Sequence, residues 1–369
     1  MSVPFLRPDI RDVDLERMTR SIKTGWLVHG PETLIFENAL KEYLGVKDAV
    51  MVGSCTAALH MSLIAAEVAD GDEVITTPLS WVATSNVILY QRAIPVFVDV
   101  EPTTGLIDVS KIEEKITSKT KAILIVHIYG QMLDIKALKE IADRHNVKII
   151  EDSAHALESQ YDGIRPGHLG FTSCLSFHVA KNITAGQGGA VVTNDIEVGR
   201  RMRLLRRDGV LNSGGKRVMT EFGYKYDSTD YQAALLIGQL ERIEETHVLR
   251  NKMFDVYNKA FTKAGVAFAE YSSLESHASH MFIVYVNPLY RDLIRTELAE
   301  KGVETSIHYQ PIHLEPYYRE KFGYKEGDYP IAEKLGASSI TLPTYTLLED
   351  AEQQYVIATL LDSIKSHAE

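Results

Sequence analysis

The sequence predicts an α/β protein with a mostly parallel sheet, helices on both faces of that sheet, and a smaller α+β domain at the C-terminus. Two observations predict this class. In the first two thirds of the 369-residue chain, short apolar runs alternate with stretches of helical periodicity, as βαβ units do. In the last third this alternation stops. We therefore expect a large domain over residues 1–240 and a small domain over residues 241–369.

The expected elements of the large domain begin with a helix over 33–45, where Phe36, Ala39, Leu40 and Tyr43 share one face. Apolar strands and helices then alternate. We expect strands over 48–53, 72–78, 94–100, 120–130, 147–152 and 172–178, and helices over 56–69, 80–92 and 134–146.

The last third predicts a different arrangement. One long helix is expected from Ala233 to Phe261, with apolar residues along one stripe. An alternating strand over 281–286, a helix over 291–302 and a final helix over 349–367 follow. This order favours a small α+β unit that closes one side of a cleft.

Composition and charge exclude several classes of protein. Thirty-nine basic and 50 acidic residues give a net charge of −11, which argues against a general binder of nucleic acid or anionic membranes. No apolar stretch is long enough for a membrane span, and the N-terminus lacks an apolar signal segment, so we expect a cytoplasmic protein. The two cysteines, Cys55 and Cys174, are too few for a four-cysteine zinc or iron–sulfur site, and no metal site is expected.

Polar residues gather where three expected strands end. Gly53 to Thr56 lies between a strand and the start of a helix, where free backbone N–H groups favour an anion. A simple N-cap by Ser54 explains the same residues. Asp152 follows a buried strand, where its carboxylate needs a cation, although it could instead cap the next turn.

Lys181 lies just past the third strand end, among apolar neighbours. Desolvation there would lower its pKa and make its amine a nucleophile toward a carbonyl. The alternative is an ordinary surface lysine. A phosphate cradle, a buried carboxylate and a reactive lysine together are the parts that pyridoxal phosphate (PLP) needs. Trp81 could supply an aromatic face for the ring, or it could pack in the core.

The ordered motifs resemble one known family. They include IIEDSAHALES (149–159), LSFHVAKNITAGQGGAVVTND (175–195), GYKYDSTDYQAAL (223–235) and GVETSIHYQPIHLEPYY (302–318). Together they resemble the DegT/DnrJ/EryC1/StrS family of PLP-dependent nucleotide-sugar aminotransferases, which have the type I fold. The resemblance covers essentially the whole chain.

The resemblance implies a role for each matching residue. Lys181 would be the catalytic residue, joined to the cofactor as a Schiff base and moving the proton. Asp152 would keep the pyridine nitrogen protonated, and His155 would bond the phenolate oxygen. Trp81 would stack on the ring. The phosphate would be held by Cys55, Thr56 and Ser176 and, from the neighbouring subunit of a homodimer with shared active sites, by Lys225.

This sequence departs from the family pattern at three positions. Lys225 replaces the usual Asn, Asp227 brings a negative charge beside it, and Gln187 replaces an acidic residue in the glycine turn. His308 and His313 match a substrate-side segment, although either could be a hydrogen-bonded loop residue. The arginines between 200 and 207 could meet a nucleotide diphosphate or form a solvated helix face.

The resemblance implies transfer of an amino group from an amino acid, glutamate by family analogy, to a nucleotide-linked keto-sugar, with a 4-keto-6-deoxyhexose as the default. Two alternatives stay open. A PLP-dependent sugar dehydratase has the same fold, but one group has His in place of the lysine and another needs four cysteines. A non-catalytic binding or regulatory relative would be expected to have lost Lys181 or Asp152.

Overall fold

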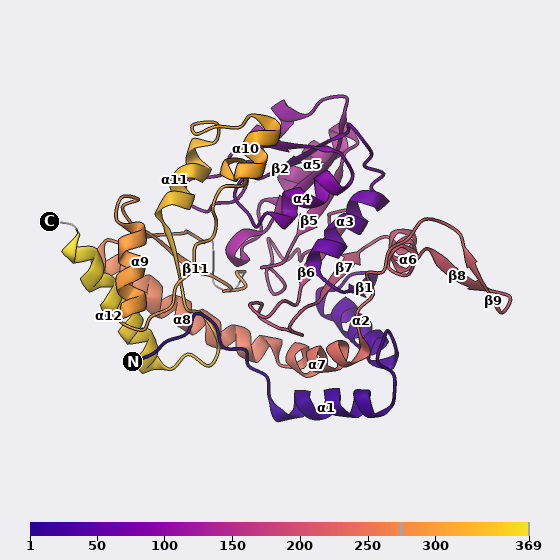
Figure 1. Ribbon diagram of the computed structural model, residues 1–369, viewed down its shortest axis with the longest axis horizontal. Helices are drawn as coiled ribbons and strands as arrows, with labels where there is room; N and C mark the ends of the chain where they lie inside the picture. Colours follow the sequence, from indigo (N-terminus) through magenta and orange to yellow (C-terminus); the bar gives the residue numbers. More distant parts are fainter. Residues whose placement is uncertain (272, 274–275, 368–369) are drawn as a thin grey trace.

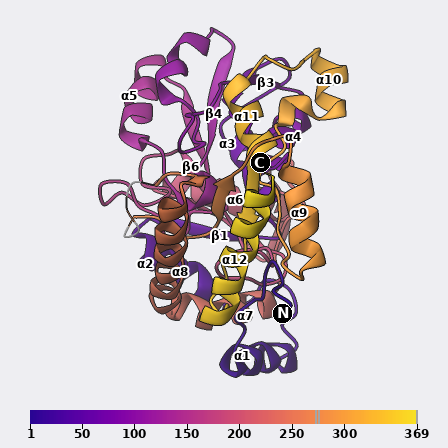
Figure 2. The same cartoon turned by 90° about the vertical axis from the view of Figure 1, so that its left-hand side faces the viewer.

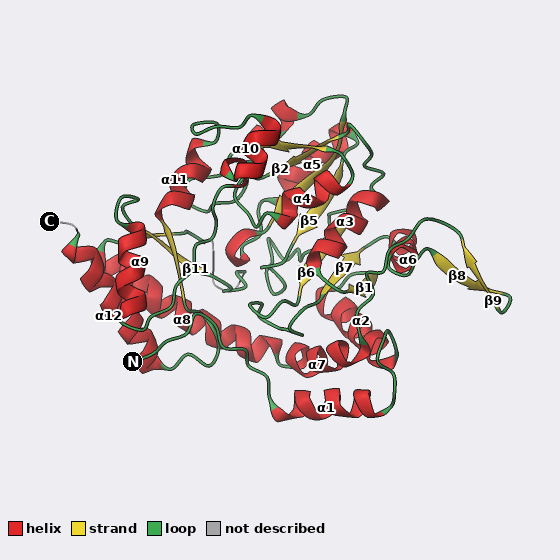
Figure 3. Ribbon diagram, in the orientation of Figure 1, coloured by secondary structure: helices red, strands yellow, loops and turns green. Residues whose placement is uncertain are grey.

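The computed structural model describes residues 1–271, 273 and 276–367. Its N-terminal two thirds form a seven-stranded sheet between helices (Figures 1 and 3). The strands are β1 (Asp48–Val52), β2 (Glu73–Thr76), β3 (Ile94–Phe97), β4 (Thr120–Val126), β5 (Lys148–Asp152), β6 (Thr172–Ser176) and β7 (Gly189–Thr193). The helices are α1 (Asp12–Lys23), α2 (Pro31–Leu44), α3 (Cys55–Ala65), α4 (Ala83–Tyr90), α5 (Ile135–His145), α6 (Ile196–Leu205) and α7 (Asp230–Glu241).

The sheet is mostly parallel, as expected from the sequence. Its strand order is β1-β7-β6-β5-β4-β2-β3, and only β7 runs antiparallel to its neighbours. Most strands therefore end at the same edge, where the loops after β1, β2, β4, β5 and β6 meet. Ligands bind at this edge in open α/β sheets.

Local chemistry explains where the helices begin and end. The side chain of Ser54 accepts the N–H of Ala57 at 3.1 Å and starts α3. Asp134 accepts the N–H of Ala137 at 3.0 Å and starts α5, which ends at Asn146 in the left-handed conformation (φ 53°). Apolar clusters lie on both faces of the sheet, one beneath α5 and another beneath α3.

The C-terminal third contains a separate antiparallel sheet of three strands, β10 (Ala267–Phe268), β11 (Phe282–Tyr285) and β12 (Ser339–Leu342). Its helices are α8 (Ile243–Ala264), α9 (Arg291–Glu300), α10 (Pro316–Phe322), α11 (Pro330–Ser338) and α12 (Asp350–Ser366). Figures 1 and 2 place α8, α9 and α12 together, away from the large sheet. The domain boundary near residue 240 stays a prediction.

One expected element is divided in two. The long helix from Ala233 to Phe261 is wrong as a single element, because α7 ends at Glu241 and α8 begins at Ile243. Arg242 between them has φ −104° and ψ 15°. Its guanidinium donates to Asp14 at 2.8 Å and to the Asp9 carbonyl at 3.0 Å. These contacts with the N-terminal segment stabilise the interruption between α7 and α8.

A two-stranded hairpin, β8 (Val210–Ser213) with β9 (Lys216–Met219), extends from the body of the molecule (Figure 1). It exposes apolar side chains, including Met219 at 61%, and Phe222 just beyond it at 70%. Within the described ranges, no helix combines the length and apolarity needed to cross a bilayer.

Candidate active site

The largest group of expected site residues lines one pocket at the carboxyl edge of the sheet. It encloses about 530 Å³, a size typical of small-molecule sites. Residues far apart in the sequence meet here because parallel strands end together. The expected residues in its lining are Cys55, Thr56, Trp81, Asp152, His155, Ser176, Lys181 and His308.

Lys181 lies in the loop after β6, and its backbone N–H bonds the His178 carbonyl at 2.9 Å. Burial lowers the pKa of its ammonium to about 8, while the negative charge of Asp152 acts in the opposite direction. A fall from 10.5 to about 8 raises the neutral fraction near pH 7 roughly 300-fold. The structure therefore favours the reactive-amine interpretation over that of a surface lysine.

Asp152 ends β5 and is 6% exposed. One carboxylate oxygen accepts the Thr84 hydroxyl at 2.9 Å, and the other accepts the Ala154 N–H at 3.2 Å. Burial nevertheless raises the pKa of this carboxyl group. A cation such as a protonated ring nitrogen would stabilise the charged form, as the resemblance implies for Asp152.

His155 has a defined tautomer. Its Nδ1 accepts the Tyr129 backbone N–H at 3.2 Å, so in the neutral ring the proton is on Nε2. Nε2 lies 3.1 Å from the Tyr309 hydroxyl, which then accepts from it. Burial, followed by the charge of Lys181, holds the pKa of His155 well below its usual value. His155 is therefore a neutral donor, suited to a phenolate oxygen.

The start of α3 supplies an anion site. Ser54 acts as the N-cap, which confirms the simpler interpretation for that residue. The N–H groups of Cys55 and Thr56 donate to no group in the described part of the chain and lie at the pocket. Gly189 of β7 packs directly against them, since an added Cβ would lie 2.5 Å from the Cys55 nitrogen. Free N–H groups at a helix start suit a phosphate.

Ser176 and Trp81 complete the lining. The Ser176 hydroxyl accepts the His178 N–H at 3.4 Å. The Trp81 side chain is 62% exposed at the pocket rather than packed in the core. Its ring is available to stack on a bound aromatic group.

The two histidines that were expected on the substrate side, His308 and His313, lie in different places. His308 lines the pocket, and its Nδ1 lies 2.7 Å from the Thr341 hydroxyl. Burial lowers the pKa of His308 to about 3. His313 is fully buried and bonded to Glu333 at 2.9 Å, and it does not line the pocket. The structure does not bring His313 to the site.

Lys225 also lies outside the pocket lining. Its side chain is 68% exposed and pairs with Asp227 at 3.0 Å, so the unusual Asp227 neutralises it within this chain. The neighbouring Tyr226 carbonyl accepts the Gly53 N–H at 2.8 Å, which places this segment beside the end of β1. Gln187, in contrast, lines the pocket.

The basic run on α6 and at its C-cap, Arg206, is largely paired with carboxylates. Arg200 contacts Glu197, Arg201 contacts Glu221, Arg203 contacts Asp48 and Arg206 contacts Glu37. Paired cations at these positions favour a structural role over recognition of a diphosphate.

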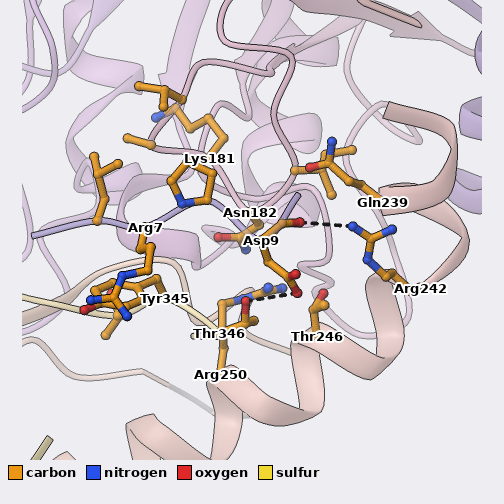
Figure 4. Close-up of a pocket in the computed structure, with 16 residues that line it drawn as sticks. Arg7, Asp9, Lys181, Asn182, Gln239, Arg242, Thr246, Arg250, Tyr345 and Thr346 are labelled. Carbon is orange, nitrogen blue, oxygen red and sulfur yellow. Dashed lines mark hydrogen bonds between the residues drawn. The ribbon is translucent and has the colours of Figure 1, made fainter. Parts of the chain in front are cut away.

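A second, smaller cavity of about 60 Å³ lies beside Lys181 (Figure 4). It is lined by the N-terminal segment, the loop of Lys181 and helices α7 and α8. Asp9 bonds both Arg242 and Thr346 here, and the buried Arg250 pairs with Glu158. Because these charged side chains are already bonded to one another, we interpret the residues around this cavity as structural support for the loop that carries Lys181.

Sequence reasoning missed three residues of this site. Thr84 bonds Asp152, Tyr309 bonds His155, and His280 packs against His155 with ring centroids 4.7 Å apart and ring planes tilted by 38°. Thr84 had a local signal, because it follows Trp81 in the same turn. Among the described residues, no group of three or more His, Cys, Asp or Glu side chains could hold a metal ion.

The comparisons with known proteins agree with this geometry. The chain is 39% identical over 362 residues to an uncharacterized protein of Methanocaldococcus jannaschii, covering 94% of both chains. It is 33% identical over 378 residues to the spore coat polysaccharide biosynthesis protein SpsC of Bacillus subtilis, covering 98% and 97% of the two chains.

Among solved structures, the putative sugar aminotransferase Spr1654 of Streptococcus pneumoniae, in its PMP form, superposes with a TM-score of 0.95. That match has 29% identity and covers 99% of this chain and 98% of the other. The pattern of one family matches residues 8–361. The chain belongs to the DegT/DnrJ/EryC1/StrS aminotransferase family.

Proposed function

We propose that this protein transfers an amino group from glutamate to a nucleotide-linked 4-keto-6-deoxyhexose. The observation that carries the proposal is the meeting of Lys181, Asp152 and the free N–H groups of α3 in one pocket. Family membership supports a sugar as the acceptor and an amino acid as the donor. The choice of glutamate as the donor and of a 4-keto-6-deoxyhexose as the acceptor is more specific than family membership and is part of the proposal.

The protein is a PLP-dependent sugar aminotransferase, and PLP is its cofactor. The residues present fit this group. The Cys55 and Thr56 N–H groups would hold the phosphate. The Asp152 carboxylate, whose pKa burial raises despite its two hydrogen bonds, would face the ring nitrogen, and His155 Nε2 would face the phenolate oxygen. When bound, PLP supplies an electron sink for the carbon that carries the amine.

Asp152, Lys181 and His155 would then have separate roles. Asp152 would stay ionised beside the ring nitrogen and would keep that nitrogen protonated. Lys181 would be the attachment point, and its Nζ would hold or deliver a proton, for which a pKa near 8 is suitable. His155 would remain neutral and would orient the ring by donating from Nε2 to the phenolate oxygen in place of the Tyr309 hydroxyl.

The test is transfer of ¹⁵N from labelled glutamate to a panel of nucleotide-linked keto-sugars, followed by mass spectrometry. We expect the wild type to label a 4-keto-6-deoxyhexose and Lys181→Ala to label none. Lys136→Ala, which removes a surface lysine paired with Asp162, is the matched control and should label normally.

Other products would point elsewhere. Transfer at the wild-type rate by Lys181→Ala would overturn the role of Lys181. Loss of a sugar oxygen without consumption of glutamate would favour the dehydratase. Labelling only of 3-keto-sugars, or only with another amino acid, would correct the substrate or the donor.

We further propose a homodimer in which Lys225 of one subunit approaches the phosphate site of the other. In support, Lys225 is exposed, and the apolar side chains of Met219 and Phe222, nearby in the sequence, are exposed too. A fully active monomer in light scattering would contradict this. The cytoplasmic location also stays a prediction.

A further inference from the structure

His280 has one buried nitrogen without a hydrogen-bond partner in the described part of the chain. The residue precedes β11 and is 5% exposed. Its Nδ1 lies 2.9 Å from the side-chain oxygen of Asn182, whereas Nε2 has no partner. A buried nitrogen left unpaired costs free energy, so Nε2 needs a donor.

The surrounding bonds fix which His280 nitrogen carries the proton. The Asn182 amide nitrogen donates to the Glu158 carboxylate at 3.0 Å and to the Ala278 carbonyl at 3.0 Å. The Asn182 oxygen is therefore the acceptor toward His280, and His280 Nδ1 carries the proton. In the neutral ring, Nε2 is then an acceptor with a free lone pair.

Lys181 lines the same small cavity as His280. The cavity measures about 10 Å³, which is at the lower limit for one water molecule. The Lys181 amine itself has no hydrogen-bond partner among the described residues. Lys181 and His280, which both line the cavity, thus each carry a side-chain nitrogen without a partner in the described part of the chain, one a donor and the other an acceptor.

The other charged or titratable groups around His280 are already engaged. Arg250 pairs with Glu158, and His277 Nδ1 accepts the Ser279 N–H at 2.9 Å. His308 is bonded to Thr341, and the Nε2 proton of His155 points to Tyr309. Among these groups, Lys181 is the one that lines the small cavity with His280 and whose side chain has no bond to a described residue.

We infer that His280 Nε2 accepts a hydrogen bond from the Lys181 amine whenever that amine is detached from the cofactor, and so acts as a positioning residue. This rests on the proposed role of Lys181. A neutral acceptor keeps the detached amine in place and leaves its proton free to move. A carboxylate at the same position would instead hold that proton on the amine. Asn182, Glu158 and Arg250 in turn hold the His280 ring in its orientation.

Two substitutions separate this role from a structural one. His280→Asn can keep the bond to Asn182, because an Asn amide nitrogen occupies the place of Nδ1, but it removes Nε2. His280→Gln places a polar atom near the position of Nε2 and loses the Nδ1 bond. His277→Asn, at a similarly buried histidine that lies away from Lys181, is the matched control.

The first readout is the pH dependence of Lys181 acetylation by acetic anhydride, followed by mass spectrometry on the full chain freed of PLP. An acceptor stabilises the ammonium and raises its pKa, so His280→Asn should lower the apparent pKa of Lys181 by about one unit. His280→Gln should restore it, and His277→Asn should leave it unchanged. NMR of ¹⁵N-histidine should show the Nδ1–H tautomer at His280.

An unchanged Lys181 pKa in His280→Asn would overturn the inference, and would leave a water molecule as the partner of Nε2. The opposite order, with Gln impaired and Asn normal, would show a purely structural histidine. Neither result depends on the sugar or the donor, so the proposed function is tested separately by the ¹⁵N transfer assay.

Discussion

Gly189→Ala tests whether the start of α3 is the phosphate site. The added Cβ would lie 2.5 Å from the Cys55 nitrogen, 2.5 Å from the Ser54 carbonyl carbon and 2.8 Å from the Leu175 oxygen. All three are backbone atoms, so no side chain can rotate away. Reaching an ordinary contact of 3.4 Å requires a shift of 0.9 Å (3.4 − 2.5).

That shift displaces the N–H groups that we assign to the phosphate. Overpacking of this kind typically costs about 1–3 kcal/mol. If this free-energy cost applies to the PLP-bound form of the protein, the Kd for PLP rises about 5- to 150-fold. Gly188→Ala is the matched control, because its Cβ would meet the Phe177 side chain at 3.3 Å and could be accommodated.

The assay is titration of each variant with PLP, followed by absorbance, with thermal unfolding measured in parallel. We expect Gly189→Ala to bind PLP much more weakly than Gly188→Ala while both remain folded. Wild-type affinity in Gly189→Ala, or equal weakening in both variants, would refute the assignment of the phosphate site.

Three further predictions concern the same pocket. Lys181 has a pKa near 8 in the folded protein and an ordinary pKa of 10.5, so its burial destabilises the PLP-free protein below pH 8, and this cost disappears as the pH rises through 10.5. Lys181→Met should therefore add up to about 3 kcal/mol to the free energy of unfolding at pH 7 and little at pH 11. Urea denaturation at the two pH values measures this difference. Equal gains at both pH values would contradict the desolvation argument. Thr84→Val removes the hydroxyl bonded to Asp152, so it should raise the pKa of that carboxyl group and weaken PLP binding about tenfold, with the largest loss at acidic pH; a pH-independent change in Kd would count against it. Mixing inactive Lys181→Ala with a weakened Lys225→Ala should restore activity if active sites are shared, whereas activity no higher than the average of the two parents would argue against sharing.

Much of the fold could be predicted because its signals are local. Alternating apolar runs and helical periodicity place six strands of the large sheet, all but β7, together with helices α2 to α5. The polar residues after β1, β5 and β6 follow from strand ends alone. The division at Arg242 could not be predicted. It depends on bonds to Asp9 and Asp14, more than 220 residues earlier in the chain.

The site was predictable only in part, for the same reason. Lys181 and Asp152 carry recognisable chemistry and lie at strand ends. His280 and Tyr309 reach the pocket from the C-terminal third, through packing that no short sequence window contains. His313 shows the converse, since it lies close to His308 in sequence but its side chain is bonded to Glu333.

The central claim is that Lys181 and Asp152 form one working PLP site. The most direct measurement is the visible absorption spectrum of the purified protein with PLP, before and after excess glutamate. The account predicts a band from lysine-bound PLP that disappears with glutamate and is absent in Lys181→Ala. A wild-type protein that gives no such band would contradict it.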